Sequence, residues 1–173
     1  EIPKRDWSSD VCSSDLTLIE QALAHFPDKS APLRVLDLGT GSGCLLLSFL
    51  HERLRADGLG LDLSEDALSF ARSNAGNLGL ETRSRFLQGE FGAAPDERFD
   101  VIFANPPYIE SAVIETLAPE VARYEPQLAL DGGPDGLACY RRIAALMPSR
   151  LTSQGLLFAE IGQGQSDAVS RIF

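Results

Sequence analysis

The glycine-rich segment Asp37–Gly43 (DLGTGSG) constrains the fold of this chain more than any other feature. It lies between an apolar run with β-strand character, Leu33–Leu38, and an apolar run of helical length, Cys44–Leu54. Glycines at such a junction let the backbone bend tightly and approach a ligand without a Cβ in the way. The segment therefore predicts a strand, a tight turn and a helix, which is the building unit of parallel α/β sheets.

The rest of the chain continues this alternation of strands and helices. Further strands are predicted over Gly58–Leu63, Arg83–Gln88, Phe99–Ala104 and Gly155–Ile161. Further helices are predicted over Thr17–Phe26, from the N-cap Ser64 to the stop at Gly79, over Gly136–Leu151 and over Gln165–Phe173. The pattern predicts an α/β protein with a mostly parallel sheet, helices on both faces, and a ligand beyond the carboxyl ends of the strands. Ile109–Pro134 is predicted to be an insertion that faces the substrate.

Composition narrows the class of protein. The 173 residues include 25 acidic and 15 basic side chains, for a net charge of -10, and 44% are hydrophobic. That is one domain's worth of chain with a core, and no apolar run approaches the roughly 18 to 20 residues that span a bilayer. The acidic balance argues against direct binding to nucleic-acid phosphates. Three widely separated cysteines, Cys12, Cys44 and Cys139, suggest neither a disulfide framework nor a metal site, and a cytoplasmic location fits best.

Residues 1–16 are unlike the rest of the chain. Asp6–Leu16 (DWSSDVCSSDL) is polar and serine-rich, with the period of neither a helix nor a strand. A codon series that resembles a common sequencing-library adapter encodes the whole stretch. We therefore expect residues 1–16 to be a non-native, disordered segment, assign no function to Trp7 or Cys12, and expect the domain to occupy residues 17–173.

Three groups of residues are candidates for holding a small ligand. The glycines follow a G-x-G-x-G spacing without a P-loop lysine, which disfavours phosphate binding and leaves a nucleotide fold or a purely structural turn. Asp62 ends the second strand, where a carboxylate can accept hydrogen bonds from two ribose hydroxyls or can simply be solvated. Glu90 and Phe91 follow the third strand, where a carboxylate and an aromatic ring could meet an adenine.

The motif Asn105-Pro106-Pro107-Tyr108 carries the most chemical information. It follows the predicted strand FDVIFA directly. Two prolines fix the backbone and remove two N–H donors, which leaves carbonyl oxygens as acceptors. The side-chain oxygen of Asn105 and the carbonyl of Pro106 can then accept both hydrogens of a planar NH2 group, on which Tyr108 can stack. The alternative is that the motif is only a proline-rich structural turn. The position of the motif after the fourth strand makes this alternative less favoured.

With these motifs in view, the chain resembles the release-factor glutamine methyltransferases, within the Rossmann-like class I S-adenosylmethionine-dependent enzymes. The resemblance spans Thr17 to Phe173. Its pieces are DLGTGSG, LDLSEDAL at Leu61–Leu68, FDVIFANPPYI at Phe99–Ile109, YEPQLALDGGPDGLACYRRI at Tyr124–Ile143 and EIGQGQ at Glu160–Gln165. By comparison with the family, we expect an N-terminal helical domain to be absent and the chain to be truncated before a final strand hairpin.

The resemblance implies a function and a site. S-adenosylmethionine would give a methyl group to the glutamine amide of the Gly-Gly-Gln motif in a release factor, leaving S-adenosylhomocysteine. Asn105, Pro106 and Tyr108 are implied as catalytic residues, and Asn105, Pro106, Pro107 and Tyr108 as substrate-binding residues. The implied cofactor residues are Gly39, Thr40, Gly41, Ser42, Gly43, Asp62, Glu90, Phe91 and Asn105. A ribosomal-protein glutamine methyltransferase and an adenine-N6 methyltransferase acting on DNA or RNA remain alternatives.

Overall fold

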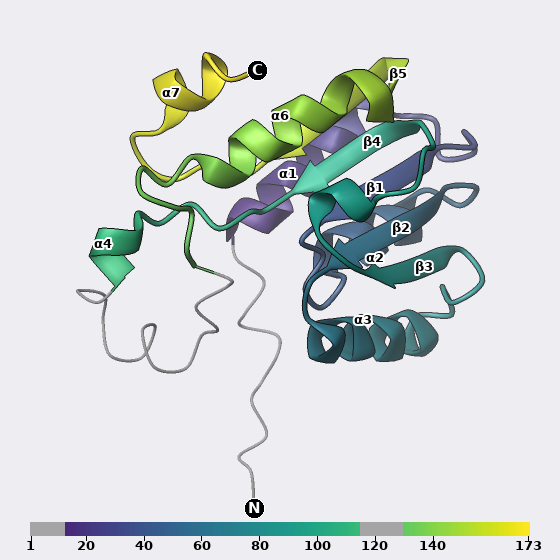
Figure 1. The fold of residues 1–173 in the computed structure, drawn as a ribbon. Coiled ribbons are helices and arrows are strands. Elements are labelled where there is room, and N and C mark those ends of the chain that lie inside the picture. Colours follow the sequence, from purple (N-terminus) through teal and green to yellow (C-terminus); the bar gives the residue numbers. More distant parts are fainter. Residues whose placement is uncertain (1–12, 115–129) are drawn as a thin grey trace, which may run out of the picture.

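Within the part of the chain that the structure describes, five parallel strands form a central sheet in the order β3-β2-β1-β4-β5 (Figure 1). The strands are β1 (Arg34–Leu38), β2 (Asp57–Asp62), β3 (Ser84–Gln88), β4 (Phe99–Ala104) and β5 (Leu151–Ala159). The computed structural model describes residues 13–114 and 130–173. The predicted parallel α/β fold is confirmed, and the strand order reverses between β1 and β4.

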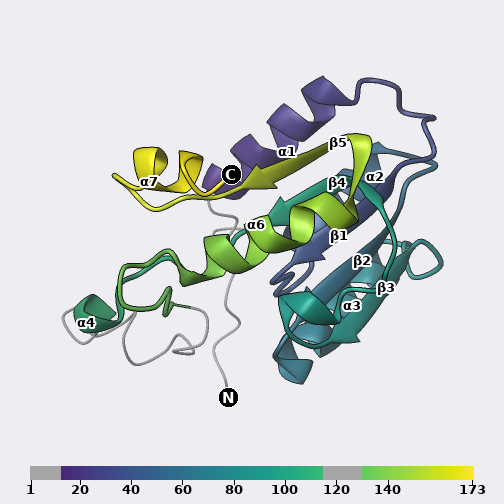
Figure 2. The ribbon, with the colours of Figure 1, turned by 45° about the horizontal axis from the view of Figure 1, so that its top comes forward.

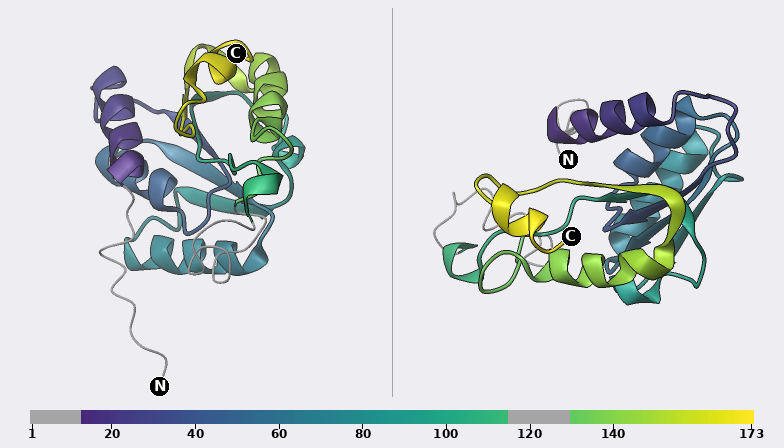
Figure 3. Two further views of the ribbon diagram at one scale, coloured as in Figure 1. Left: turned by 90° about the vertical axis from the view of Figure 1, so that its left-hand side faces the viewer. Right: turned by 90° about the horizontal axis from the view of Figure 1, so that it is seen from above.

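Helices cover both faces of the sheet. Figure 3 shows α1 (Ser13–His25) on one side of the strands and α6 (Ala138–Arg150) on the other. On the first face, α1, α2 (Cys44–Glu52) and α3 (Glu65–Asn77) contribute to a core that includes Phe49 and Phe103. On the second face, α6 and the 3-10 helix η2 (Phe91–Ala93) pack around Leu36, Ile102 and Ile143. Apolar side chains that alternate along β1 and β4 supply both cores, as expected for a doubly covered sheet.

Arg53 ties α1 to α2 from a buried position. Its side chain is 3% exposed, and it donates hydrogen bonds to the carbonyl oxygens of Phe26 at 2.7 Å and Leu23 at 2.7 Å. These carbonyls belong to the end of α1, where no intrahelical donor is available. The guanidinium therefore satisfies the helix terminus and fixes α1 against the sheet.

Among the described elements, α4 (Ser111–Ile114) and α7 (Ser166–Ser170) are short helices beyond the carboxyl ends of the strands. Figures 1 and 2 show both helices projecting from that end. The backbone of Ile109 is bridged to Asp131, which brings the two described ends of the predicted insertion together. The greater part of that insertion, residues 115–129, lies outside the described residues. Within the part of the chain that is described, no helix has the length and apolarity needed to cross a membrane.

Element boundaries differ from the sequence prediction at two instructive places. The first helix begins at Ser13, four residues before the predicted Thr17, so the last four residues of the adapter-like segment are helical and the expectation of disorder is wrong for them. Asp15 lies in the first turn, where a carboxylate is favourable near the positive end of the helix dipole. Residues 1–12 of that segment lie outside the described residues, and its non-native origin stays a prediction.

The last strand begins at Leu151 and not at the predicted Gly155. Leu151 pairs with Phe99, but the register then shifts before Val101 pairs with Leu156. The polar stretch Thr152–Gly155 has the composition of a turn and is accommodated as an irregularity within the strand. Such a β-bulge keeps the strand paired on either side of the extra residues.

Candidate active site

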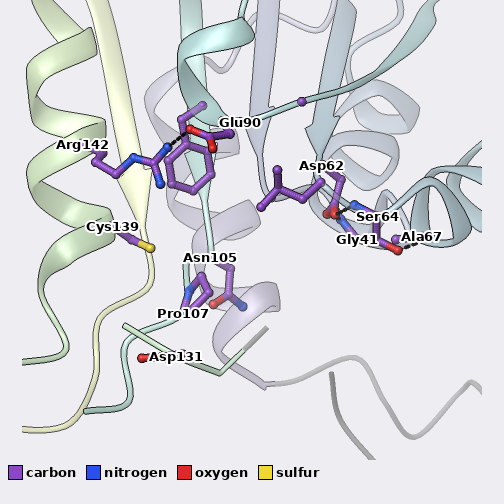
Figure 4. Close-up of a pocket in the computed structure, with 14 residues that line it drawn as sticks. Gly41, Asp62, Ser64, Ala67, Glu90, Asn105, Pro107, Asp131, Cys139 and Arg142 are labelled. Atoms are coloured by element: carbon purple, nitrogen blue, oxygen red, sulfur yellow. Dashed lines mark hydrogen bonds and ion pairs between the residues drawn. The ribbon is translucent and has the colours of Figure 1, made fainter. Parts of the chain in front are cut away.

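A cavity of about 430 Å³ opens where the strand order reverses, between the ends of β1, β2 and β4 (Figure 4). It is bounded by the glycine turn, the ends of β2 and β3, the Asn-Pro-Pro-Tyr motif and one side of α6. Its lining residues are Gly39, Gly41, Asp62, Leu63, Ser64, Ala67, Gly89, Glu90, Phe91, Asn105, Pro107, Asp131, Cys139 and Arg142. The volume lies within the range of roughly 300 to 1,000 Å³ of small-molecule sites.

The glycine turn forms the floor of this cavity. Gly39, Gly41 and Gly43 all have positive φ angles, of 76°, 54° and 82°, which side chains with a Cβ rarely adopt. The backbone N–H groups of Gly39 and Thr40 donate to the carbonyl of Leu61, which ties the turn to the end of β2. A Cβ on Gly41 would meet no atom within 4 Å, so the turn faces open space there.

Asp62 links the glycine turn to the start of α3. Its Oδ2 accepts a hydrogen bond from the backbone N–H of Gly41 at 2.8 Å, and its Oδ1 accepts one from the backbone N–H of Ser64 at 2.9 Å (Figure 4). Each carboxylate oxygen has a second lone pair. Asp62 can therefore hold the turn and still accept hydrogen bonds from a diol in the cavity.

Three of the predicted cofactor residues do not line the cavity. Thr40 is buried, and its hydroxyl donates to Asp37 at 2.6 Å. The carbonyl of Ser42 accepts a hydrogen bond from the side chain of Asn74 in α3 at 3.0 Å. Gly43 is the N-cap of α2. These three residues therefore support the glycine turn on the side away from the cavity.

The Asn-Pro-Pro-Tyr motif lies beside the glycine turn at the carboxyl end of β4. Asn105 and Pro107 line the cavity, whereas Pro106 is buried beneath them. A Cβ placed on Gly39 would lie 3.9 Å from the carbonyl oxygen of Asn105, so the two motifs lie close together although far apart in the chain. The topology thus brings both predicted motifs to one site, because β1 and β4 are neighbours.

A carboxylate of α1 holds the side chain of Asn105. The amide Nδ2 of Asn105 donates a hydrogen bond to Oδ1 of Asp15 over 3.1 Å. Burial raises the pKa of Asp15, the hydrogen bond from Asn105 opposes that rise, and the negative charge of Glu160 adds to it. The bond fixes the amide with Nδ2 toward α1, so its Oδ1 is the group left to accept a hydrogen bond.

Tyr108 points away from the cavity lining, toward the segment after β5. Its hydroxyl donates to Oε1 of Glu160 at 3.1 Å, and its carbonyl accepts from Nε2 of Gln165 at 3.0 Å. Gly136 packs against the same carbonyl, since a Cβ there would lie 2.4 Å from it. The segments that begin at Asp131 and at Glu160 therefore contact the Asn-Pro-Pro-Tyr motif from two sides. The sequence of the motif does not indicate these contacts.

A buried carboxylic acid lies behind the glycine turn. Burial raises the pKa of Asp37 to about 7, and the charges of Asp15 and Asp62 add to the rise, while the hydroxyl of Thr40 opposes it. Oδ1 of Asp37 has no hydrogen-bond partner within the described structure. The protonation of a buried carboxyl group such as Asp37 is coupled to the binding of charged groups nearby.

Glu90 and Phe91 form one wall of the cavity, and a third residue, Arg142, joins them. The guanidinium of Arg142 on α6 is paired with Oε2 of Glu90 and lies 5.7 Å from the centre of the Phe91 ring (Figure 4). Arg142, Cys139 and Asp131 also line the cavity, and their motifs gave no sign of it. The first two are placed by the packing of α6 against the sheet, and Asp131 by its bridge to Ile109. Among the described residues, no cluster of His, Cys, Asp and Glu could hold a metal ion.

An open parallel sheet with a cavity at its switch point, a glycine turn below and a strand-end carboxylate beside it defines the Rossmann-like α/β class of nucleotide-binding proteins. A family model described as "Methyltransferase domain" matches residues 29–157, and the chain belongs to this family. The fold agrees with a solved structure, the ribosomal protein L11 methylase of Lactobacillus delbrueckii subsp. bulgaricus. That structure superposes with a TM-score of 0.62 at 21% identity, over 92% of this chain and 64% of the other.

Curated relatives are similar over most of this chain. A release factor glutamine methyltransferase of Caulobacter vibrioides is 49% identical over 158 residues, covering 90% of this chain and 54% of the relative. A ribosomal protein uL3 glutamine methyltransferase of Bradyrhizobium diazoefficiens is 44% identical over 133 residues, covering 76% of this chain and 41% of the relative. The resemblance predicted from the motifs is confirmed. The chain spans about half the length of the curated relatives it matches.

Proposed function

We propose that this chain is the catalytic domain of an S-adenosylmethionine-dependent methyltransferase that modifies the glutamine amide of the Gly-Gly-Gln motif in a release factor. The observation that carries the proposal is that the glycine turn and Asn105 lie close together in one cavity, with Asp62 on its edge. A donor of methyl groups and an acceptor amide can meet only where both motifs meet. The similarity to release factor glutamine methyltransferases supports the acceptor.

The residues present fit the cofactor. Asp62 retains acceptor capacity for two ribose hydroxyls, the open space above Gly41 has room for a close ligand, and Glu90 with Phe91 offers an acceptor and a ring for adenine. When bound, S-adenosylmethionine supplies an electrophilic methyl group. The cofactor residues proposed in contact with it are Gly39, Gly41, Asp62, Glu90, Phe91 and Asn105, and Thr40, Ser42 and Gly43 support them.

On the acceptor side, two oxygens of the Asn-Pro-Pro-Tyr motif are proposed to hold a planar NH2 group. A glutamine amide nitrogen is a poor nucleophile because its lone pair is delocalised into the carbonyl. The Oδ1 of Asn105 and the carbonyl of Pro106 accept the two N–H hydrogens, which favours partial pyramidalisation of the nitrogen. In this chain Nδ2 of Asn105 is bonded to Asp15, a residue of the segment expected to be non-native, and the amide is turned with its acceptor oxygen available. Rate is gained mainly from positioning and fixed dipoles.

A ribosomal-protein acceptor is the second candidate. The uL3 enzyme matches less of this chain, and at lower identity, than the release factor enzyme does. An adenine acceptor would use the same pair of oxygens, but the net charge of -10 does not suit a nucleic-acid partner. We infer that the protein acts on its protein substrate in the cytoplasm.

The acceptor is tested by incubating the chain with methyl-labelled S-adenosylmethionine and, in parallel, a release factor, ribosomal protein uL3 and adenine-containing duplex DNA. We expect label on the release factor, and none on the same factor with alanine in place of the motif's glutamine. Labelling of uL3 or DNA in preference to the release factor would overturn the proposed substrate.

The catalytic motif is tested by Asn105→Ala. Loss of one aligned acceptor is expected to lower turnover by about 100-fold or more. Affinity for S-adenosylhomocysteine, measured by calorimetry, is expected to stay within about threefold, since the ribose and adenine contacts remain. Turnover near the wild-type rate would show that Asn105 is not part of the catalytic arrangement.

A further inference from the structure

The wall of the cavity opposite the glycine turn contains a cation that the predicted function leaves unused. Arg142 lies on α6, one turn beyond Cys139, and both residues line the cavity. Its guanidinium is paired with Oε2 of Glu90 and lies 5.7 Å from the centre of the Phe91 ring. One side chain therefore contacts both residues proposed to meet adenine.

The pairing leaves Glu90 with a defined free acceptor. Oε2 faces Arg142, and Oε1 has no hydrogen-bond partner among the described residues. Without the pair, Glu90 would be a solvent-exposed carboxylate with free rotation, since its side chain is 67% exposed. An arginine nitrogen that engages one oxygen of a carboxylate restricts the orientation of the other oxygen.

The cation also bears on the aromatic ring. A guanidinium near a phenyl face is attracted to it, which restrains both groups. Phe91, the first residue of η2, packs against the core, and its ring is also contacted by Arg142. The three side chains form a single unit made from two elements, the turn after β3 and the helix α6.

We propose that Arg142 is a positioning residue that determines specificity for adenine, by holding Glu90 so that Oε1 accepts a hydrogen bond from the 6-amino group. The inference rests on the proposed cofactor site and names a determinant within it. A 6-amino group donates a hydrogen bond, whereas the 6-oxo group of hypoxanthine accepts one. A fixed carboxylate acceptor therefore favours the first base and disfavours the second.

The chain supplies a matched control for this residue. Arg141 is the neighbouring side chain on α6, of the same chemistry and similar exposure, but it pairs with Asp135 at 2.5 Å and does not line the cavity. Arg142→Met removes the charge and keeps the length of the side chain, and Arg141→Met makes the same change outside the cavity. Arg142→Lys keeps a charge that can reach Glu90.

The experiment measures the dissociation constants of S-adenosylhomocysteine and S-inosylhomocysteine by calorimetry on the whole chain. We expect Arg142→Met to weaken S-adenosylhomocysteine binding by about tenfold and to lower the preference over the inosine analogue by a similar factor. Arg142→Lys should restore part of that preference, and Arg141→Met should leave it within about twofold. Glu90→Gln should abolish the effect of Arg142→Met in the double variant.

Each contrary result has a distinct meaning. If Arg142→Met weakened both ligands equally, or weakened neither, the positioning role would be wrong while the cofactor site stood. If the folded wild-type chain bound neither ligand, the proposed cofactor site would be wrong, and the role of Arg142 with it. The thermal midpoint of each variant verifies the fold, and Glu90→Gln tests the same unit from its other end should Arg142→Met unfold.

Discussion

The side-chain amide of Asn105 and the carboxylate of Asp15 are joined by a hydrogen bond of 3.1 Å, although 90 residues separate them in the chain. The bond crosses from the end of β4 to the first turn of α1 and sets which end of the amide faces the cavity. Because an amide can donate through nitrogen and accept through oxygen, the orientation decides what Asn105 can recognise.

Replacing Asp15 should release that amide. In Asp15→Ala we expect the side-chain NH2 signals of Asn105 to shift and their hydrogens to exchange faster, because the acceptor is gone. Asp15→Asn should retain most of the wild-type signal, since its side-chain oxygen can accept the same bond. Two-dimensional nitrogen–proton NMR, with Asn105→Ala to assign the signals, makes the measurement. Unchanged signals in Asp15→Ala would show that the bond does not hold the amide in solution.

Asp62 is expected to serve both stability and binding. In Asp62→Ala the N–H groups of Gly41 and Ser64 lose their shared acceptor, which should cost about 1 to 3 kcal/mol of unfolding free energy. Affinity for S-adenosylhomocysteine should fall by about tenfold or more, since the acceptor proposed for the ribose is removed. Urea unfolding and calorimetry measure the two effects. Asp66→Ala, an exposed carboxylate in the first turn of α3, is the control and should change binding by less than twofold.

The stability of the fold should depend on pH through Asp37. Its pKa is raised to about 7 in the folded protein, from an ordinary value of 3.8. Between these two values the folded carboxyl keeps a proton that the unfolded chain has lost, so raising the pH lowers stability by about 1.4 kcal/mol per unit. Above about pH 7 the loss is complete. Urea unfolding from pH 4 to 8 should show this slope in the wild type, and Asp37→Asn should remove it. Equal slopes in the two proteins would contradict the prediction.

Gly136 is expected to tolerate no side chain. Its φ angle is +68°, and a Cβ would lie 2.4 Å from the carbonyl oxygen of Tyr108. Gly136→Ala should therefore destabilise the protein by about 2 kcal/mol or more and displace the Asn-Pro-Pro-Tyr motif. Gly76→Ala is the matched control, because Gly76 lies in α3 with open space around it and should gain up to about 1 kcal/mol. Thermal unfolding compares them, and equal stabilities would refute the close contact.

The alternation of strands and helices was predictable because it follows from local residue patterns. The apolar runs around Asp37–Gly43 and before Asn105 identify β1 and β4 without reference to any distant contact. The boundaries that were wrong, at Ser13 and Leu151, depend on pairing with other elements. A helix whose first turn bonds Asn105, the residue after β4, and a strand that continues through an irregularity have no local signal.

The sequence by itself determined the class of fold, the glycine turn and the acceptor motif, because each depends on residues that are adjacent in the chain. Only the tertiary structure decided which of those residues meet. The order β2-β1-β4 brings Gly39 to Asn105, and the packing of α6 brings Arg142 to Glu90. The tertiary structure also shows that Thr40, Ser42 and Gly43 do not line the cavity. The physical reason is that hydrogen bonds and side-chain contacts act over a few ångströms in space, whatever distance separates their partners along the chain.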